Sequence, residues 1–172
     1  GSNVVIKQNR VGLHGRHFNM YKFRTMKKDS HKLRDEMREL NQNDAAIFKI
    51  EDDPRIINGA KFLRNYSLDE LPQFFNVLIG NMSVVGPRPH MIKENERYSK
   101  SVDKFMVRHF VKPGITGLAQ VKGFRGEIET DEDIINRVKY DIYYLENWSL
   151  ILDLNIVFLT TINFLTGQKK AY

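Results

Sequence analysis

The run SLDELPQFFNVLIG, from Ser67 to Gly80, decides how the middle of the chain folds. Ser67 followed three residues later by Glu70 matches a capping box, in which each side chain satisfies a backbone N–H of the other residue. Pro72 opposes a helix that begins there, because a proline inside a helix removes a hydrogen bond and crowds the preceding turn. The alternative is a helix over about Leu71–Ile79 that stops at Gly80 and leaves both acids just ahead of its N-terminus. Both interpretations remain open at this point.

The residues before this run predict a β-hairpin and a helix. Two strand-like segments, Val4–Val11 and His17–Arg24, flank turn-forming residues 12–15, a pattern typical of a hairpin. Residues 29–40 are dense in charge and carry apolar side chains at helical spacing, which predicts a solvated helix with one narrow apolar stripe.

The residues after it predict short strands between helices. A brief strand is expected over Ser83–Gly86, an amphipathic helix over Ile92–Phe110, a second strand over Leu118–Val121 and a helix over Asp131–Glu146. The predicted fold class is therefore α+β: a helix-rich single domain with an N-terminal β-hairpin, short strands and amphipathic interfacial helices.

The most apolar segment, Trp148–Leu165, is interrupted by polar residues and is too short to span a bilayer. Its large apolar side chains suit a helix that lies in a membrane interface, and Lys169 and Lys170 at its end suit acidic headgroups. They suit an ordinary core helix equally well, so both alternatives stay open.

The composition is that of a globular protein, with 172 residues, 41% of them hydrophobic and 28% charged. The absence of cysteine excludes disulfides and thiolate metal sites, and the five histidines lack the spacing of a zinc site. A net charge of +6 favours anionic partners. Gly1-Ser2 looks like the remnant of a purification tag, so residues 3–172 are taken as the domain.

Asp69 and Glu70 share their segment with three arginines, Arg55, Arg64 and Arg88. A carboxylate can hold Mg²⁺ or attack phosphorus, and arginine binds phosphate oxygens through a bidentate fork. Pro87 and Pro89 flank Arg88 and reduce the entropy lost when its backbone is fixed. Each residue alone could be an ordinary surface charge, but together they favour phosphoryl-transfer chemistry.

Several ordered motifs resemble the signature of the bacterial sugar transferase family, the monotopic polyprenyl-phosphate hexose-1-phosphate transferases, in the branch that serves exopolysaccharide and capsule assembly. They cover nearly the whole chain. In order they are YKFRTM at 21–26, DPRI at 53–56, SLDELPQ at 67–73, NVL at 76–78, VGPRP at 85–89, KPGITGLAQV at 112–121, YD at 140–141 and WSL at 148–150.

This resemblance implies a Mg²⁺-dependent enzyme with an Asp69-Glu70 dyad. Asp69 is the implied nucleophile and metal ligand: it attacks the sugar-bearing phosphate of a UDP-sugar, releases UMP and carries a phosphosugar adduct. Polyprenyl (undecaprenyl) phosphate then attacks that adduct, and Glu70 is implied to assist proton or metal handling. The residues expected to bind the nucleotide diphosphate are Arg88, Pro87, Pro89, Arg64, Arg55, Arg24 and Lys22.

The resemblance further implies a place on the cytoplasmic face of a bacterial inner membrane, held by a hydrophobic segment expected to precede Val4 in the natural protein. The membrane surface is thus an expected partner, and a homodimer is an open alternative to a monomer. One residue departs from the family pattern: many relatives carry an acid where this chain has Asn81, whose amide brings no charge.

Two other functions compete with the transferase interpretation. A nucleic-acid-binding module fits the positive charge, but the basic residues are scattered among acids and no reader motif is present, so no nucleic-acid partner is expected. A catalytically silent membrane scaffold would bind lipid without turnover.

Overall fold

A computed structural model describes residues 3–28, 30, 54–126, 128 and 130–166 of the chain. The helix predicted for residues 29–40 falls, but for Ser30, outside these residues, as do Lys169 and Lys170. In chain order the elements are β1 (Val5–Val11), η1 (Leu13–Gly15), β2 (His17–Phe23), α2 (Ala60–Asn65), η2 (Leu68–Glu70), α3 (Gln73–Leu78), β3 (Ser83–Val85), α4 (Ile92–Ser101), η3 (Phe105–Phe110), β4 (Gly114–Thr116), η4 (Gln120–Phe124), α5 (Asp131–Glu146) and α6 (Leu150–Thr166). The predicted α+β class is confirmed.

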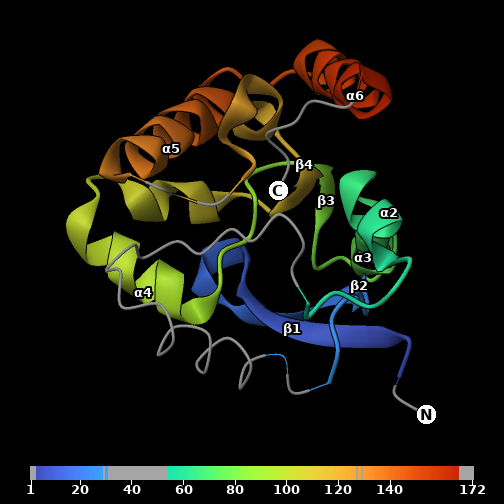
Figure 1. Ribbon diagram of the computed structural model, residues 1–172. Helices are drawn as coiled ribbons and strands as arrows, with labels where there is room; N and C mark the ends of the chain where they lie inside the picture. Colours follow the sequence, from blue (N-terminus) through green and yellow to red (C-terminus); the bar gives the residue numbers. More distant parts are fainter. Residues whose placement is uncertain (1–2, 29, 31–53, 127, 129, 167–172) are drawn as a thin grey trace.

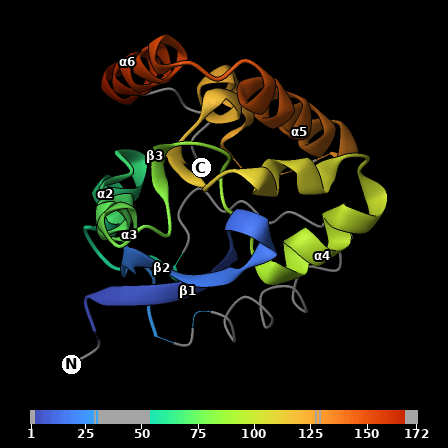
Figure 2. The same ribbon diagram turned by 180° about the vertical axis from the view of Figure 1, so that it is seen from behind.

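The N-terminal hairpin is confirmed. β1 and β2 pair antiparallel, with Val5 opposite Phe23 and Val11 opposite His17. The 3-10 turn η1 joins them, and His14 and Gly15 both have positive φ there. Figures 1 and 2 show the hairpin on one side of the molecule, α5 and α6 on the other, and β3 and β4 between them.

β3 and β4 form a short parallel pair, with Ser83 opposite Gly114 and Val85 opposite Thr116. The backbones approach so closely that a Cβ on Gly86 or Gly114 would overlap backbone atoms of the facing segment. The strand predicted over Leu118–Val121 is wrong. Strand pairing stops at Thr116 because β3 offers no further partner, and the residues that follow turn into a helical segment.

The single helix predicted over Ile92–Phe110 is also wrong, because it breaks into α4 and the 3-10 helix η3. Val102 is extended and Lys104 has a positive φ of 56° between them. The break brings both Tyr98 and Phe105 into one buried cluster with side chains of α5.

α5 follows its predicted bounds, and Thr130 caps it by accepting a hydrogen bond from the Asp133 N–H. Its Tyr144 packs in a second cluster with Val85, Leu118 and Ile156.

α6 is the least covered helix among the described elements. Ile156 is its one buried residue, whereas nine of its large apolar side chains are exposed. The core-helix alternative for this segment is therefore wrong. No helix in the described ranges has the length and apolar character needed to cross a bilayer.

Trp148 lies just ahead of α6 and is 61% exposed. Its indole N–H donates to one carboxylate oxygen of Asp153, and the Tyr144 hydroxyl donates to the other. Asp153 therefore ties the start of α6 to the end of α5.

Candidate active site

The two acids of the SLDELPQ motif lie in the 3-10 turn η2, immediately ahead of α3. Ser67 has a positive φ of 49° and its side chain caps nothing. The capping-box interpretation is therefore wrong, and the alternative, with both acids ahead of a short helix, is confirmed. Asp69 and Glu70 are nonetheless 5% and 3% exposed. Buried carboxylates require compensating partners.

Glu70 has three cationic partners from distant parts of the chain. The Lys22 ammonium on β2 lies 2.8 Å from Oε1, the Arg88 guanidinium 3.1 Å from Oε1, and the Arg125 guanidinium 3.2 Å from Oε2. Burial by itself would raise the pKa of Glu70, but Arg88, Lys22 and Arg125 outweigh it and hold this pKa well below its usual range. Glu70 is therefore an ionised carboxylate that gathers three cations.

Asp69 has a different environment. Within the described residues its Oδ1 is buried and accepts no hydrogen bond. Burial raises the pKa of Asp69 above its usual range, and the neighbouring Glu70 charge adds to the rise, while Lys22 and Arg64 oppose it. A buried carboxylate oxygen whose lone pairs accept no hydrogen bond can serve either as a metal ligand or as a nucleophile. Mg²⁺, as a hard cation that prefers oxygen, fits this atom.

The structure brings some of the predicted residues to the acids and gives others different contacts. Lys22 and Arg88 bind Glu70 directly, and Arg64, at the end of α2, acts on Asp69 through its charge. Arg24 instead donates from Nε to the Asn3 carbonyl oxygen.

Arg55 lies beside the segment that follows β2, where its carbonyl accepts the Lys27 N–H. Pro87 and Pro89 flank Arg88, and the Pro87 carbonyl accepts the Gly114 N–H. Asn81 follows the end of α3, where its backbone N–H donates to the Asn76 carbonyl.

Arg125 is a residue of the candidate site that the sequence did not predict. It follows η4, a π-type helical segment in which Gly123 takes a positive φ of 96°. The available signal was local: in the run Gly123-Phe124-Arg125-Gly126, a basic residue stands in a glycine-flanked turn. Its contact with Glu70, 55 residues away, depends on the tertiary fold.

Comparisons with known proteins agree on the family. The family model described as "Bacterial sugar transferase" matches residues 1–167. The chain is 47% identical over 169 residues to a UDP-glucose:undecaprenyl-phosphate glucose-1-phosphate transferase of Klebsiella pneumoniae, covering 98% of this chain and 34% of that protein. A protein of the same name from Xanthomonas campestris pv. campestris is 48% identical, over 98% of this chain and 33% of its own length.

A third relative carries a name with a different sugar. The undecaprenyl-phosphate galactose phosphotransferase of Salmonella typhimurium is 43% identical, over 93% of this chain and 33% of its own length. The chain thus spans about a third of the length of these curated relatives. Similarity at this level accompanies both glucose and galactose in the relatives' names.

Proposed function

The chain belongs to the bacterial sugar transferase family, and from that premise we propose that it transfers a hexose-1-phosphate from a UDP-sugar to polyprenyl phosphate and releases UMP. The observation that carries the proposal is the contrast between two adjacent buried acids. Asp69 presents an oxygen that accepts no hydrogen bond within the described residues, while Glu70 holds three cations around it.

In the first proposed step an Asp69 carboxylate oxygen attacks the sugar-bearing phosphorus of the UDP-sugar. The bond from this phosphorus to the bridging oxygen breaks, and UMP leaves with the bonding electrons. In the second step a phosphate oxygen of the polyprenyl phosphate attacks the same phosphorus and displaces the Asp69 carboxylate. The lipid then carries a diphosphate-linked sugar and Asp69 is restored, as expected of covalent catalysis.

The cations around Glu70 suit a diphosphate that must be bound and then split. Lys22, Arg88 and Arg125 are 12%, 22% and 24% exposed, so part of each side chain remains accessible. Arginine and lysine stabilise the charge that develops on transferring phosphoryl groups. Because Glu70 stays ionised, it is better suited to hold these cations in place than to carry a proton.

Mg²⁺, when bound, would neutralise phosphate charge and polarise the attacked phosphorus. Asp69 Oδ1 is the atom that fits it. The described residues hold no group of three or more His, Cys, Asp or Glu side chains that could bind a metal. Phosphate oxygens and water would therefore have to complete the coordination, as is common for Mg²⁺.

A membrane surface is the proposed location, and exposed apolar side chains support it. Large apolar residues are exposed on α6 and also around α2 and α3, where Phe74 is 49% and Leu78 83% exposed. The ring centroids of Tyr66, which follows α2, and Phe164 of α6 lie 5.8 Å apart, so the two areas are in contact. Figures 1 and 2 place α2, α3 and α6 along one side of the molecule. We call this side the apolar face; patches of this kind mark interaction surfaces.

The test is UMP release from a panel of UDP-sugars with undecaprenyl phosphate and Mg²⁺ in lipid nanodiscs. Asp69→Asn should reduce turnover by at least about a thousandfold, because an amide is a poor nucleophile. Incubation with the UDP-sugar and Mg²⁺, without the lipid acceptor, should add the mass of one hexose phosphate to the unsubstituted chain and none to the variant. Asp103→Asn, the same change at an exposed site, is the matched control and should turn over normally.

Two results would contradict the proposal. Turnover that survives unchanged in Asp69→Asn would exclude the covalent mechanism. Salt-sensitive oligonucleotide binding without any UMP release would favour the nucleic-acid-binding alternative.

A further inference from the structure

A buried cluster of charged side chains lies between η3 and α5, next to the candidate site. Asp141 on α5 is 2% exposed, and the Arg108 guanidinium of η3 approaches its carboxylate to 2.8 Å. Arg137, one turn earlier on α5, is 6% exposed and is the second cation that acts on Asp141. Two buried guanidinium groups therefore share one carboxylate. We call these three residues the buried triad.

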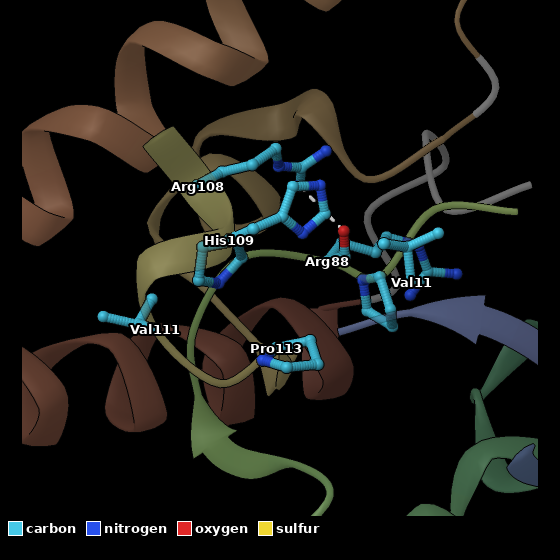
Figure 3. Close-up of a pocket in the computed structure, with 8 residues that line it drawn as sticks. Val11, Arg88, Arg108, His109, Val111 and Pro113 are labelled. Carbon is cyan, nitrogen blue, oxygen red and sulfur yellow. Dashed lines mark hydrogen bonds between the residues drawn. The ribbon is translucent and has the colours of Figure 1, made fainter. Parts of the chain in front are cut away.

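Each arginine of the buried triad donates to a loop carbonyl that borders the site. Arg108 Nη2 lies 2.7 Å from the carbonyl oxygen of Arg88, and Figure 3 shows this guanidinium directed at that oxygen. Arg137 Nη2 lies 2.7 Å from the carbonyl oxygen of Gly126, the residue directly after Arg125. The two anchored loops are thus the two that supply arginines to Glu70.

Backbone hydrogen bonds hold the carbonyls of Pro87 and His90, on either side of Arg88, while the carbonyl of Arg88 itself is held by Arg108. Pro87 and Pro89 have no N–H to donate, so the segment around Arg88 is fixed through its carbonyls. The Gly126 carbonyl follows a left-handed glycine, Gly123, in a segment outside any sheet. Hydrogen bonds from a charged guanidinium are shorter and stronger than neutral ones, so each arginine is an effective anchor.

We propose that Arg108, Arg137 and Asp141 are positioning residues that set the places of Arg88 and Arg125, so that both reach Glu70. The inference rests on the proposed function for its catalytic consequence. Arg108 acts on Arg88 and Arg137 acts on Arg125, while Asp141 offsets part of the positive charge of the two anchors. The competing explanation is a purely structural cluster, in which the triad stabilises the packing of α5 and has no selective effect on either arginine.

The primary test replaces each anchor by lysine, which keeps the charge but offers no planar fork. The Nε–Hε resonances of Arg88 and Arg125, measured by NMR, report the environment of each guanidinium. Arg108→Lys should shift the Arg88 resonance and leave that of Arg125 in place, and Arg137→Lys should do the reverse. Each should lower kcat/KM for the UDP-sugar by about 10- to 100-fold, the size expected from a small misplacement. Tyr144→Phe removes a part-buried hydrogen bond from the same helix and should change neither the two resonances nor kcat/KM.

A second variant separates positioning from stability. Replacing the whole triad by apolar residues, as Arg108→Met, Asp141→Leu and Arg137→Met together, removes all three buried charges, and such replacements often preserve folding. Positioning predicts a normal melting temperature with both resonances shifted and kcat/KM still reduced. Wild-type kcat/KM in this folded variant, or lysine variants that behave like Tyr144→Phe, would overturn the inference. Absence of UMP release from the unsubstituted chain would instead overturn the proposed function, and the two resonances would still decide how the arginines are placed.

Discussion

Asp69 and Glu70 are neighbours in sequence, yet burial and charge shift their pKa values in opposite directions. Glu70 faces three cations and keeps its proton affinity low, whereas desolvation dominates at Asp69 and raises its pKa. Adjacent acids with separated pKa values commonly divide their roles at a site. In the proposed mechanism this division gives covalent chemistry to Asp69 and the placement of cations to Glu70.

The acid side of the pH–rate profile should belong to Asp69. Its carboxylate must be ionised to attack. As the pH is lowered, kcat/KM should therefore begin to fall at a higher pH than an ordinary aspartate would give, because the pKa of Asp69 is raised. Lys22 lowers the pKa of Asp69, and Lys22→Met should therefore move the acid limb of kcat/KM to higher pH. Lys7→Met, on the neighbouring strand and exposed, is the control and should leave the limb in place. A limb that stays fixed in Lys22→Met would show that another group controls it.

At this scale the sequence predicted which residues lie at the candidate site better than it predicted the contacts among them. Asp69, Glu70, Lys22 and Arg88 were all named, and the structure brings them together. The predicted capping box is wrong because Ser67 adopts a left-handed backbone conformation, which the pattern of side chains does not predict. Arg125 was missed because its contact with Glu70 arises from how the turn after η4 folds back.

Among the elements, α3 matters beyond its six residues because it secures β2. Asn76 is fully buried; its amide N–H donates to the Asn19 carbonyl and its amide oxygen accepts the Tyr21 N–H. One side chain thus supplies hydrogen bonds to two backbone groups of β2. Lys22 follows directly after Tyr21, so this contact also helps to place a cation of the site.

Asn76→Ala should lower the free energy of unfolding by about 2–4 kcal/mol, because it removes a fully buried side chain together with its two hydrogen bonds to the backbone of β2. Urea denaturation monitored by circular dichroism measures the loss. Asn147→Ala removes an exposed side-chain hydrogen bond to the Tyr143 carbonyl and should cost only about 0.5 kcal/mol. Equal losses in the two variants would contradict the role assigned to Asn76.

The elements that could be predicted are those whose own residues determine them. The hairpin follows from its turn and flanking apolar runs, and α5 follows from its N-terminal cap and apolar periodicity. The break after α4 could not be predicted, because it serves the joint packing of Tyr98 and Phe105 against α5. β4 was misplaced because its register depends on a close approach of Gly86 and Gly114.

The molecule as a whole is asymmetric, with the apolar face on one side. If that face contacts lipid, a charge placed on it should weaken binding to vesicles of phosphatidylethanolamine and phosphatidylglycerol. Phe158 is 64% exposed on α6. Phe158→Glu should lower the affinity for vesicles by about tenfold, and a flotation assay measures the bound fraction from which the affinity follows. Met106→Glu, at an exposed apolar side chain of η3 outside the apolar face, is the control and should bind as the unsubstituted chain does. Equal binding by the two variants would remove α6 from the membrane contact.

The position of Trp148 has a practical consequence. It is the one tryptophan of the chain, it precedes α6, and it is mostly exposed to water. Indole fluorescence shifts to the blue when the ring leaves water, and brominated lipid chains quench it at short range. The unlabelled protein therefore carries its own optical probe at the helix in question, and a single emission spectrum with and without vesicles reports whether α6 enters the lipid.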